Sequence, residues 1–351
     1  MEIKAVQEFI KGISDKDLNT PVLIIGATGI GKSYQLKDLA KEQGEGFGFI
    51  DLRLATQEVT DLIGIPRMVK DSEGHPRTTW TKPTWFPKAG TKGILALEEL
   101  NRAPEDVRQA IFQLLTEWKL HTHELPSSWA IVGLINPDNG SYHVNQLDPA
   151  FRRRFVQIAV DNPTDIDWCK WAKNNEVESD VIRFVATFPR LLANPESIEI
   201  QANPTPAGYH LISKLLKHKV LTDDTTHEIL SGIVGVEAAT SFISSLKKGF
   251  EKPITADQIL ENYSKVQDKF KQQVANNRND MTYVTMVDLI ATFETLTLTK
   301  SKGENIKNFL LDCPSEMLTT IVLRSNLRIL NKLSQYEELI TEITKITNAI
   351  R

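Results

Sequence analysis

The chain has 351 residues, of which 41% are hydrophobic and 25% charged, so its composition is that of a globular protein with room for more than one domain. Its formal net charge of -4 gives no basic excess of the kind that binding to a phosphate backbone requires, so nucleic acid is not the expected partner. No apolar run of about 18 residues occurs and the two cysteines lack metal-ligand spacing, so we expect a cytoplasmic protein with no membrane-spanning helix.

Residues 21–160 alternate short β-branched runs with helical patterns. The runs read PVLII, FGFIDL, GILAL, WAIVGLI and FVQIAV. This alternation predicts βαβ crossovers, and hence a parallel sheet with helices on both faces. One of the expected helices, PEDVRQAIFQLLTEWKL, places on a single stripe the core residues Val107, Ile111, Leu114, Leu115 and Trp118.

The texture changes after Asn162 and Pro163, where amphipathic helical segments follow with almost no strand signal. A third stretch, from about Gly249 to the end, is also helical and includes the segment EMLTTIVLRSNLRILNKL. The sequence therefore predicts an α/β domain over residues 1–162 with an N-terminal helix, a helical domain over 163–248 and a helical extension over 249–351.

Residues 22–33 read VLIIGATGIGKS and fit the pattern G-x-x-x-x-G-K-[ST] directly after a strand and before a helix. A loop around a polyphosphate must point several backbone N–H groups inward, and glycines clear their approach. Lys32 can reach the β and γ phosphates of ATP, and the Ser33 hydroxyl can ligate Mg²⁺. The expected nucleotide-binding residues are Gly26, Ala27, Thr28, Gly29, Ile30, Gly31, Lys32, Ser33 and Tyr34.

Two adjacent carboxylates, Glu98 and Glu99, follow the apolar run of residues 94–97. An interior strand would deliver both at its carboxyl end, which is the edge where open α/β sheets bind ligands. One carboxylate, Glu98, can hold Mg²⁺ through its water shell, and the other, Glu99, can polarise an attacking water.

The segments GATGIGKS, ILALEELNRAPEDV, WAIVGLINP and LDPAFRRRF, in this order, resemble an AAA+ ATPase module, and EELNRAP is similar to the E-I-N-R-A-P of the MoxR-like (dynein-related) branch. The resemblance covers residues from about 20 to 245. It implies an AAA+ P-loop core over 1–162 and an all-α lid over 163–248, with the extension over 249–351 not plainly covered. It also implies ATP and Mg²⁺ as cofactors and a ring of subunits, with six as the family expectation.

The resemblance assigns roles to two further positions. Asn136, at the end of the run AIVGLI, matches a polar sensor between the γ phosphate and the attacking water, although an asparagine opening a turn is an alternative. The run of residues 152–154 matches the arginine finger that reaches the nucleotide of a neighbouring subunit. Arg154 is the first candidate and Arg153 the second, and a basic surface patch is the alternative.

Two positions depart from the family pattern. The metal-binding aspartate of the family is replaced by Glu98, which is one methylene longer, and the lid phrase S/T-P-R reads Thr205, Pro206, Ala207, so the arginine that senses nucleotide from the lid is missing. We therefore expect a modest loss in rate, and lid movement that is weakly coupled to hydrolysis unless another cation substitutes.

The insert between the second and third expected strands contains KPTWFP and faces the ring pore or its top surface in MoxR-like proteins. Trp80 and Trp85 are there either as contacts for a client or as staples that hold a β-hairpin to the domain.

The leading hypothesis is a ring-forming ATPase that remodels a protein partner, for which the resemblance suggests a protein with a von Willebrand factor type A domain. One alternative is a nucleotide-gated scaffold with slow or vestigial hydrolysis. Another is a nucleic-acid motor or loader, against which the near-neutral charge argues.

Overall fold

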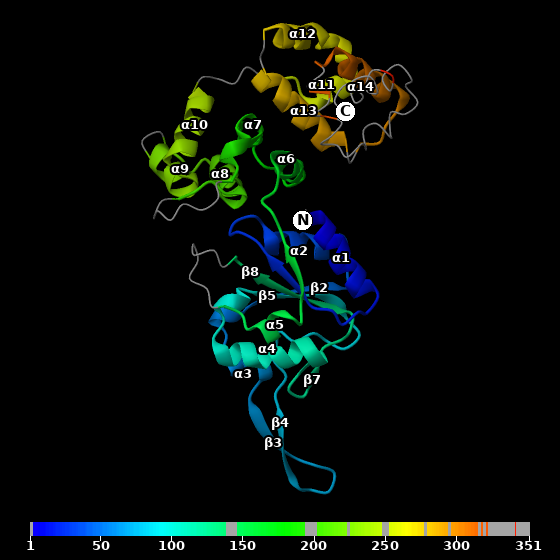
Figure 1. Cartoon of the computed structure of the whole chain (residues 1–351), viewed down its shortest axis with the longest axis vertical. Coiled ribbons are helices and arrows are strands. Elements are labelled where there is room, and N and C mark those ends of the chain that lie inside the picture. The colour runs from blue at the N-terminus through cyan, green and yellow to red at the C-terminus, as the bar shows by residue number, and fades with distance from the viewer. Residues whose placement is uncertain are drawn as a thin grey trace. The chain divides into compact units, whose positions relative to one another are not determined.

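The computed structural model describes residues 3–137, 146–193, 202–222, 225–247, 253–276, 279–293, 296–314, 317, 318, 321 and 341. The chain divides into two compact units, Met1–Asn162 and Pro163–Arg351 (Figure 1). Each unit is described by itself below. Within the described residues, none of the helices combines the length and the apolar character that a membrane crossing requires.

The first unit is built on a five-stranded sheet with the edge-to-edge order β2-β5-β8-β1-β9. All neighbouring strands are parallel, so their carboxyl ends lie together, along what is called here the carboxyl edge of the sheet. Their amino ends lie along the opposite, amino edge. Because β1 lies between β8 and β9, the loop that leaves β1 opens beside the carboxyl end of β8. The strands are β1 (Val22–Ile25), β2 (Phe47–Arg53), β5 (Lys92–Glu98), β8 (Trp129–Ile135) and β9 (Val156–Ala159).

Helices cover both faces of this sheet because alternate strand residues point to opposite sides. Ile94 and Ala96 of β5 belong to a core with the helices α1 (Ile3–Asp15) and α2 (Lys32–Glu42), whereas Leu95 and Leu97 belong to a second core with α4 (Glu105–Glu117). All five residues predicted for the stripe of α4 and its end are buried. The remaining short helices are η1 (Leu54–Thr56), α3 (Val59–Ile63), η2 (Leu100–Arg102) and α5 (Pro149–Arg152).

Two small antiparallel hairpins are added to the sheet. The longer one pairs β3 (Pro66–Lys70) with β4 (Pro76–Trp80) and extends away from α3 and α4 (Figure 1). The shorter one pairs β6 (Lys119–Leu120) with β7 (His123–Glu124). The longer hairpin is the insert that the sequence places between the second and third strands of the sheet.

The described residues of the second unit form helices and no strands. One hydrophobic core runs from Ile166 to Ile321, so the helices on both sides of residue 248 share it. The helices are α6 (Asp165–Asn174), α7 (Ser179–Thr187), η3 (Pro189–Leu191), α8 (Pro206–Lys217), α9 (Thr226–Val234), α10 (Val236–Lys247), α11 (Ala256–Asn262), η4 (Tyr263–Lys265), α12 (Gln267–Ala275), α13 (Asn279–Phe293) and α14 (Lys300–Asp312).

The predicted fold class is confirmed: a parallel α/β core is followed by a helical region. The boundary expected near residue 248, which would separate a lid from an extension, stays a prediction. The helix predicted for EMLTTIVLRSNLRILNKL falls almost entirely outside the described residues.

Candidate nucleotide-binding site

The glycine-rich loop joins the carboxyl end of β1 to the first turn of α2. Gly31, immediately before α2, has φ 95°, a left-handed conformation that a side chain disfavours. Gly26 has a different constraint, because a Cβ there would lie 2.8 Å from Ile30 Cδ1 and 3.0 Å from the carbonyl oxygen of Val160. Gly29, with φ 79°, is left-handed as well. The loop therefore needs glycine at two positions for backbone conformation and at Gly26 for space.

Lys32, the first residue of α2, turns its ammonium back into the loop. Its Nζ donates to the carbonyl oxygens of Gly26 (2.6 Å) and Ala27 (2.8 Å) and to Oδ1 of Asn136 (3.2 Å). Burial lowers the pKa of Lys32 to about 8, and the nearby Glu98 carboxylate partly opposes this shift. The loop thus concentrates a buried cation where a triphosphate would need one.

Glu98, the last residue of β5, lies beside Ser33 of α2. The Ser33 hydroxyl donates a hydrogen bond to the Glu98 carboxylate. The Oε1 atom of Glu98 is buried without a hydrogen-bond partner. Burial raises the pKa of Glu98, and the Ser33 hydrogen bond works against that rise. A buried carboxylate oxygen without a partner next to a hydroxyl is a donor set that suits Mg²⁺, so these residues fit the metal that the sequence implies.

Glu98 and Ser33 are too few to hold a metal ion alone. Among the residues that the structure describes, no group of three or more His, Cys, Asp and Glu side chains is arranged around a metal position. Any Mg²⁺ at Ser33 and Glu98 would complete its shell with phosphate oxygens and water, which is the usual arrangement for this ion.

Glu99 is the first residue after β5, and it has the left-handed conformation φ 54°, ψ 37°. This conformation costs about 1–2 kcal/mol in a residue with a Cβ, and such strain is concentrated at functional sites. The Glu99 side chain is 45% exposed, and its Oε1 lies 3.8 Å from Nη1 of Arg102. Glu99 therefore faces solvent at the edge of the sheet where the loop lies.

Asn136 directly follows β8, and strand pairing places it beside Gly26, because Ile25 of β1 is paired with Ile135. Its Oδ1 accepts from Lys32 Nζ, as described above, and its backbone oxygen accepts a hydrogen bond from Nδ2 of Asn101 (3.0 Å). The structure thus brings Lys32, Ser33, Glu98 and Asn136 together, as the sequence suggested. Asn101 was missed, although it lies within the quoted motif EELNRAP.

The predicted arginines lie at the amino edge of the sheet, opposite the carboxyl edge that holds the glycine-rich loop. Arg153 and Arg154 precede β9, whose first residue, Val156, is paired with Val22, the first residue of β1. The four residues of β1, about 13 Å of extended chain, separate that level from the glycine-rich loop. The structure therefore does not bring these arginines to the site of their own chain.

The two arginine candidates differ in their surroundings. The Arg154 guanidinium lies 3.9 Å from the centroid of the Phe112 ring, and its Nη1 donates to the carbonyl oxygen of Ala150 (2.6 Å). Its Nε is buried without a hydrogen-bond partner. Arg153, by contrast, is exposed. Arg154 packs against α4 of the same chain, and Arg153 is exposed to solvent.

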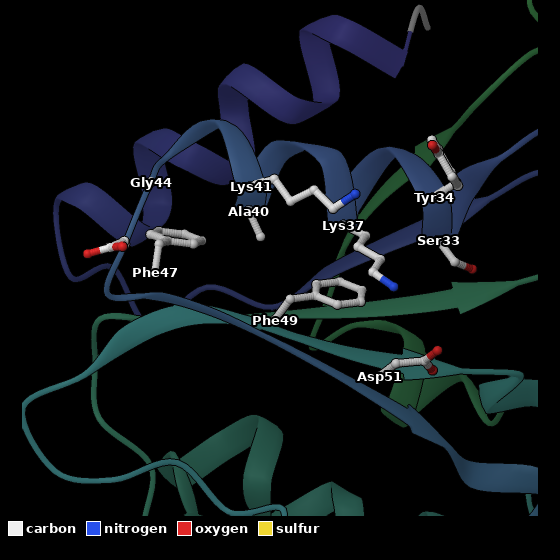
Figure 2. Close-up of a pocket in the computed structure, with 10 residues that line it drawn as sticks. Ser33, Tyr34, Lys37, Ala40, Lys41, Gly44, Phe47, Phe49 and Asp51 are labelled. Carbon is white, nitrogen blue, oxygen red and sulfur yellow. The ribbon is translucent and has the colours of Figure 1, made fainter. Parts of the chain in front are cut away.

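A cavity of about 910 Å³ adjoins the site between α2 and the edge strand β2. Ser33 and Asp51 lie at one end, and Figure 2 shows Lys37 on α2 opposite Phe49 on β2. The negative charge of Asp51 contributes to the raised pKa of Glu98. Sequence reasoning missed Asp51, because only the pairing of β2 with β5 brings it near Glu98.

A glycine-rich loop between β1 and a helix, with carboxylates at the end of β5 and an amide at the end of β8, defines a P-loop ATPase of the AAA+ class. The sequence comparison agrees, since residues 21–155 match the AAA domain of the dynein-related subfamily. These residues are an AAA domain of that subfamily, and the protein is an ATPase. No curated protein matches the sequence.

Solved structures with a similar arrangement are distant. NtrX from Brucella abortus in complex with ADP is 12% identical with a TM-score of 0.39, covering 96% of this chain and 68% of its own. A RuvB variant from Thermotoga maritima is 12% identical with a TM-score of 0.38, covering 76% of each chain. Scores this low assign no function to the present chain.

Proposed function

We propose that this chain is a ring-forming AAA+ ATPase of the MoxR-like kind, which binds ATP and Mg²⁺ between subunits and uses hydrolysis to remodel or activate a protein partner. The AAA domain supports nucleotide binding and hydrolysis. The ring, the metal and the partner are part of the proposal, and six subunits is the number that the family resemblance suggests.

The observation that carries the proposal is the separation of two sets of residues within one sheet. Lys32, Glu98 and Asn136 lie at its carboxyl edge, whereas Arg153 and Arg154 lie at its amino edge. If Arg153 or Arg154 stabilises the γ phosphate, it therefore comes from another copy. One copy would present its amino edge to the carboxyl edge of the next, and such a head-to-tail contact closes into a ring when its rotation permits.

Each residue has a definite task in the proposed hydrolysis. The loop amides and Lys32 would hold the triphosphate, and Ser33 and Glu98 would hold Mg²⁺, which would supply positive charge beside the phosphates. Glu99 accepts the proton of the attacking water, and Asn136 orients that water against the γ phosphate. The neighbour's Arg154 or Arg153 neutralises charge that develops in the transition state.

The contact with a partner is proposed for the β3–β4 hairpin. Trp80 and Trp85 are held by their own domain: the Trp80 ring lies 4.3 Å from that of His121, and Trp85 Nε1 donates to the Asp61 carbonyl oxygen (2.9 Å). The large apolar residues left exposed on or beside the hairpin are Ile65 (63%) and Met68 (74%). These two apolar side chains are the better candidates for a client contact, and the partner with a von Willebrand factor type A domain rests on the resemblance alone.

Two observations favour a second function, in which ATP binding sets the geometry of a scaffold and hydrolysis is slow. Glu98, one methylene longer than the aspartate of the related pattern, stands in the metal position and would hold the ion less tightly. Ala207 is exposed in the first turn of α8, where the related pattern has an arginine. Turnover separates the two functions.

The test is the variant Glu99→Gln, which keeps the size of the side chain and removes the base. We expect turnover to fall by about 10²-fold or more while ATP still binds with affinity close to that of the unmodified protein. The matched control is Glu105→Gln, an exposed carboxylate in the first turn of α4. If Glu99→Gln keeps most of its activity, Glu99 is not the base, and if the unmodified protein binds ATP without turnover, the scaffold function is favoured.

A further inference from the structure

A chain of hydrogen bonds joins the end of β5 to the glycine-rich loop through the end of β8. Asn101 Nδ2 donates to the Asn136 carbonyl oxygen (3.0 Å), and Asn136 Oδ1 accepts from Lys32 Nζ (3.2 Å). Asn101 is 3% exposed. Asn101 is buried and donates to a backbone oxygen at the site. Removing this amide would leave the Asn136 carbonyl oxygen without that donor, which costs free energy.

The partners in this chain fix the orientation of both amides. A carbonyl oxygen can only accept, so the group of Asn101 that meets Asn136 is its NH₂. An ammonium can only donate, so the atom of Asn136 that meets Lys32 is its oxygen. The NH₂ group of Asn136 is therefore on the branch that points away from Lys32, and it can serve as a donor toward a phosphate oxygen or a water.

The backbone after β5 explains how Asn101 comes to lie there. The left-handed conformation of Glu99 turns the chain, and the Arg102 N–H donates to the Glu99 carbonyl oxygen (2.7 Å) to close that turn. Leu100 is fully buried and packs so closely that a Cβ on Gly133 of β8 would lie 3.1 Å from its Cδ2. Asn101 is thus two residues from Glu99 in the chain and hydrogen-bonded to Asn136. It links Glu99 and Asn136, the two residues that must act on the same water molecule.

We propose that Asn101 is a positioning residue that sets the placement of Asn136 relative to Glu99 and Lys32, a proposal that rests on the proposed ATPase function. Its side chain acts on hydrolysis through the backbone of Asn136, and it touches neither nucleotide nor water. Misplacement of a catalytic group by about 1 Å can cost 10²-fold in rate, so the loss of this tie affects the chemical step more than binding.

The test is Asn101→Leu in the full-length protein, because leucine keeps the branching and the number of heavy atoms of the buried side chain and removes its donor. The matched control is Ser14→Ala. Ser14 is 2% exposed, and its Oγ donates to the Ser128 carbonyl oxygen (2.9 Å), one residue before β8, whereas Asn101 donates to the oxygen one residue after β8. Each variant removes a buried donor to a carbonyl oxygen that flanks β8, one before the strand and one after it.

We expect Asn101→Leu to lower kcat by about 10- to 100-fold, with KM for ATP and ADP affinity changed less than threefold, and Ser14→Ala to leave kcat within twofold. Asn136→Ala supplies the second half of a double-mutant cycle. If Asn101 acts through Asn136, the double variant Asn101→Leu, Asn136→Ala is as slow as Asn136→Ala alone, and the two effects do not multiply.

Three results would overturn the proposal: unchanged kcat in Asn101→Leu, multiplicative losses in the double variant, or an equal loss of kcat in Ser14→Ala. If Asn101→Leu does not fold, Asn101→Asp, which has the same shape and no donor when ionised, is measured in its place with the same expected loss. Failure of the underlying function is recognised separately, because Glu99→Gln would then retain turnover or the unmodified protein would have none.

Discussion

At the scale of single residues, Lys32 is the group whose pKa folding and nucleotide binding shift in opposite directions. Its ammonium is buried and hydrogen-bonded to the loop that it serves, and burial lowers its pKa from 10.5 to about 8. A bound triphosphate would stabilise the charged form and raise that pKa again. The affinity for nucleotide therefore depends on the proton that Lys32 carries.

This linkage predicts how nucleotide affinity changes with pH. Below pH 8 Lys32 is already charged in the free protein, so its titration leaves the affinity unaffected, whereas above pH 8 binding must be accompanied by uptake of a proton. We expect the Kd for ADP to rise about tenfold per pH unit above 8, until the pKa of the bound state is passed. Calorimetry between pH 7 and 10 in buffers of different ionisation enthalpy measures both the Kd and the proton uptake. A flat Kd up to pH 10 would show that the pKa of Lys32 is not lowered.

The residues that sequence reasoning found and those that it missed differ in how local their signal is. Lys32 and Ser33 belong to a motif of eight consecutive residues whose chemistry can be derived from spacing alone. Asp51 and Asn101 enter the site only because β2 pairs with β5 and the turn at Glu99 faces β8. The stacking of Arg154 on Phe112 is also a tertiary contact, so the sequence ranked Arg154 before Arg153 by the family resemblance and not by their surroundings.

At the scale of elements, the sheet was largely predictable and the inserted hairpin was not. The run WAIVGLI coincides with β8, and the other four apolar runs match their strands to within one residue at each end. Fully buried parallel strands give such uninterrupted apolar runs. The strands β3 and β4 are mostly exposed and carry no alternating apolar pattern, so the sequence indicated an insert with two tryptophans and offered a hairpin there only as one of two alternatives.

The base of the hairpin depends on Gly64. This residue has φ 85°, and a Cβ there would lie 1.8 Å from the Thr81 carbonyl oxygen, whereas Gly74 at the tip has φ 82° and open space around it. We expect Gly64→Ala to cost about 2–4 kcal/mol in the free energy of unfolding, since it adds a clash to the strain, and Gly74→Ala about 1 kcal/mol. Urea unfolding of both variants measures the difference. Equal losses in the free energy of unfolding would mean that the backbone around Gly64 and Thr81 shifts to relieve the clash without a measurable loss of stability.

Trp85 distinguishes a staple from a client contact. It is partly buried against the core around α4, its ring lies 5.2 Å from that of Phe86, and its Nε1 is bonded to Asp61. We expect Trp85→Ala to destabilise the protein by about 2 kcal/mol, through lost burial and a lost hydrogen bond, and Met68→Ala to change stability by less than about 0.5 kcal/mol. Thermal melting compares the two. A stable Trp85→Ala variant with normal basal turnover would restore Trp85 as a contact for a client.

At the scale of the whole molecule, the parallel sheet gives the α/β unit two chemically different edges. The carboxyl edge holds the buried cation and the carboxylates, and the amino edge holds the arginine run. One copy therefore does not bring its arginine run to its own carboxyl edge. Completion in trans is the central claim of the proposed function, and it requires only that the two edges of different copies meet.

The most direct test mixes two inactive variants of the full-length protein. Glu99→Gln keeps the arginines and lacks the base, and the double variant Arg153→Ala, Arg154→Ala keeps the base and lacks the cations. Each is expected to be inactive alone. In an equimolar mixture that assembles at random, about a quarter of the sites combine an intact Glu99 with an intact neighbouring arginine, so we expect about a quarter of the unmodified turnover per subunit. A mixture as inactive as its two components, or an arginine double variant that is fully active by itself, would contradict completion of the site by a second copy.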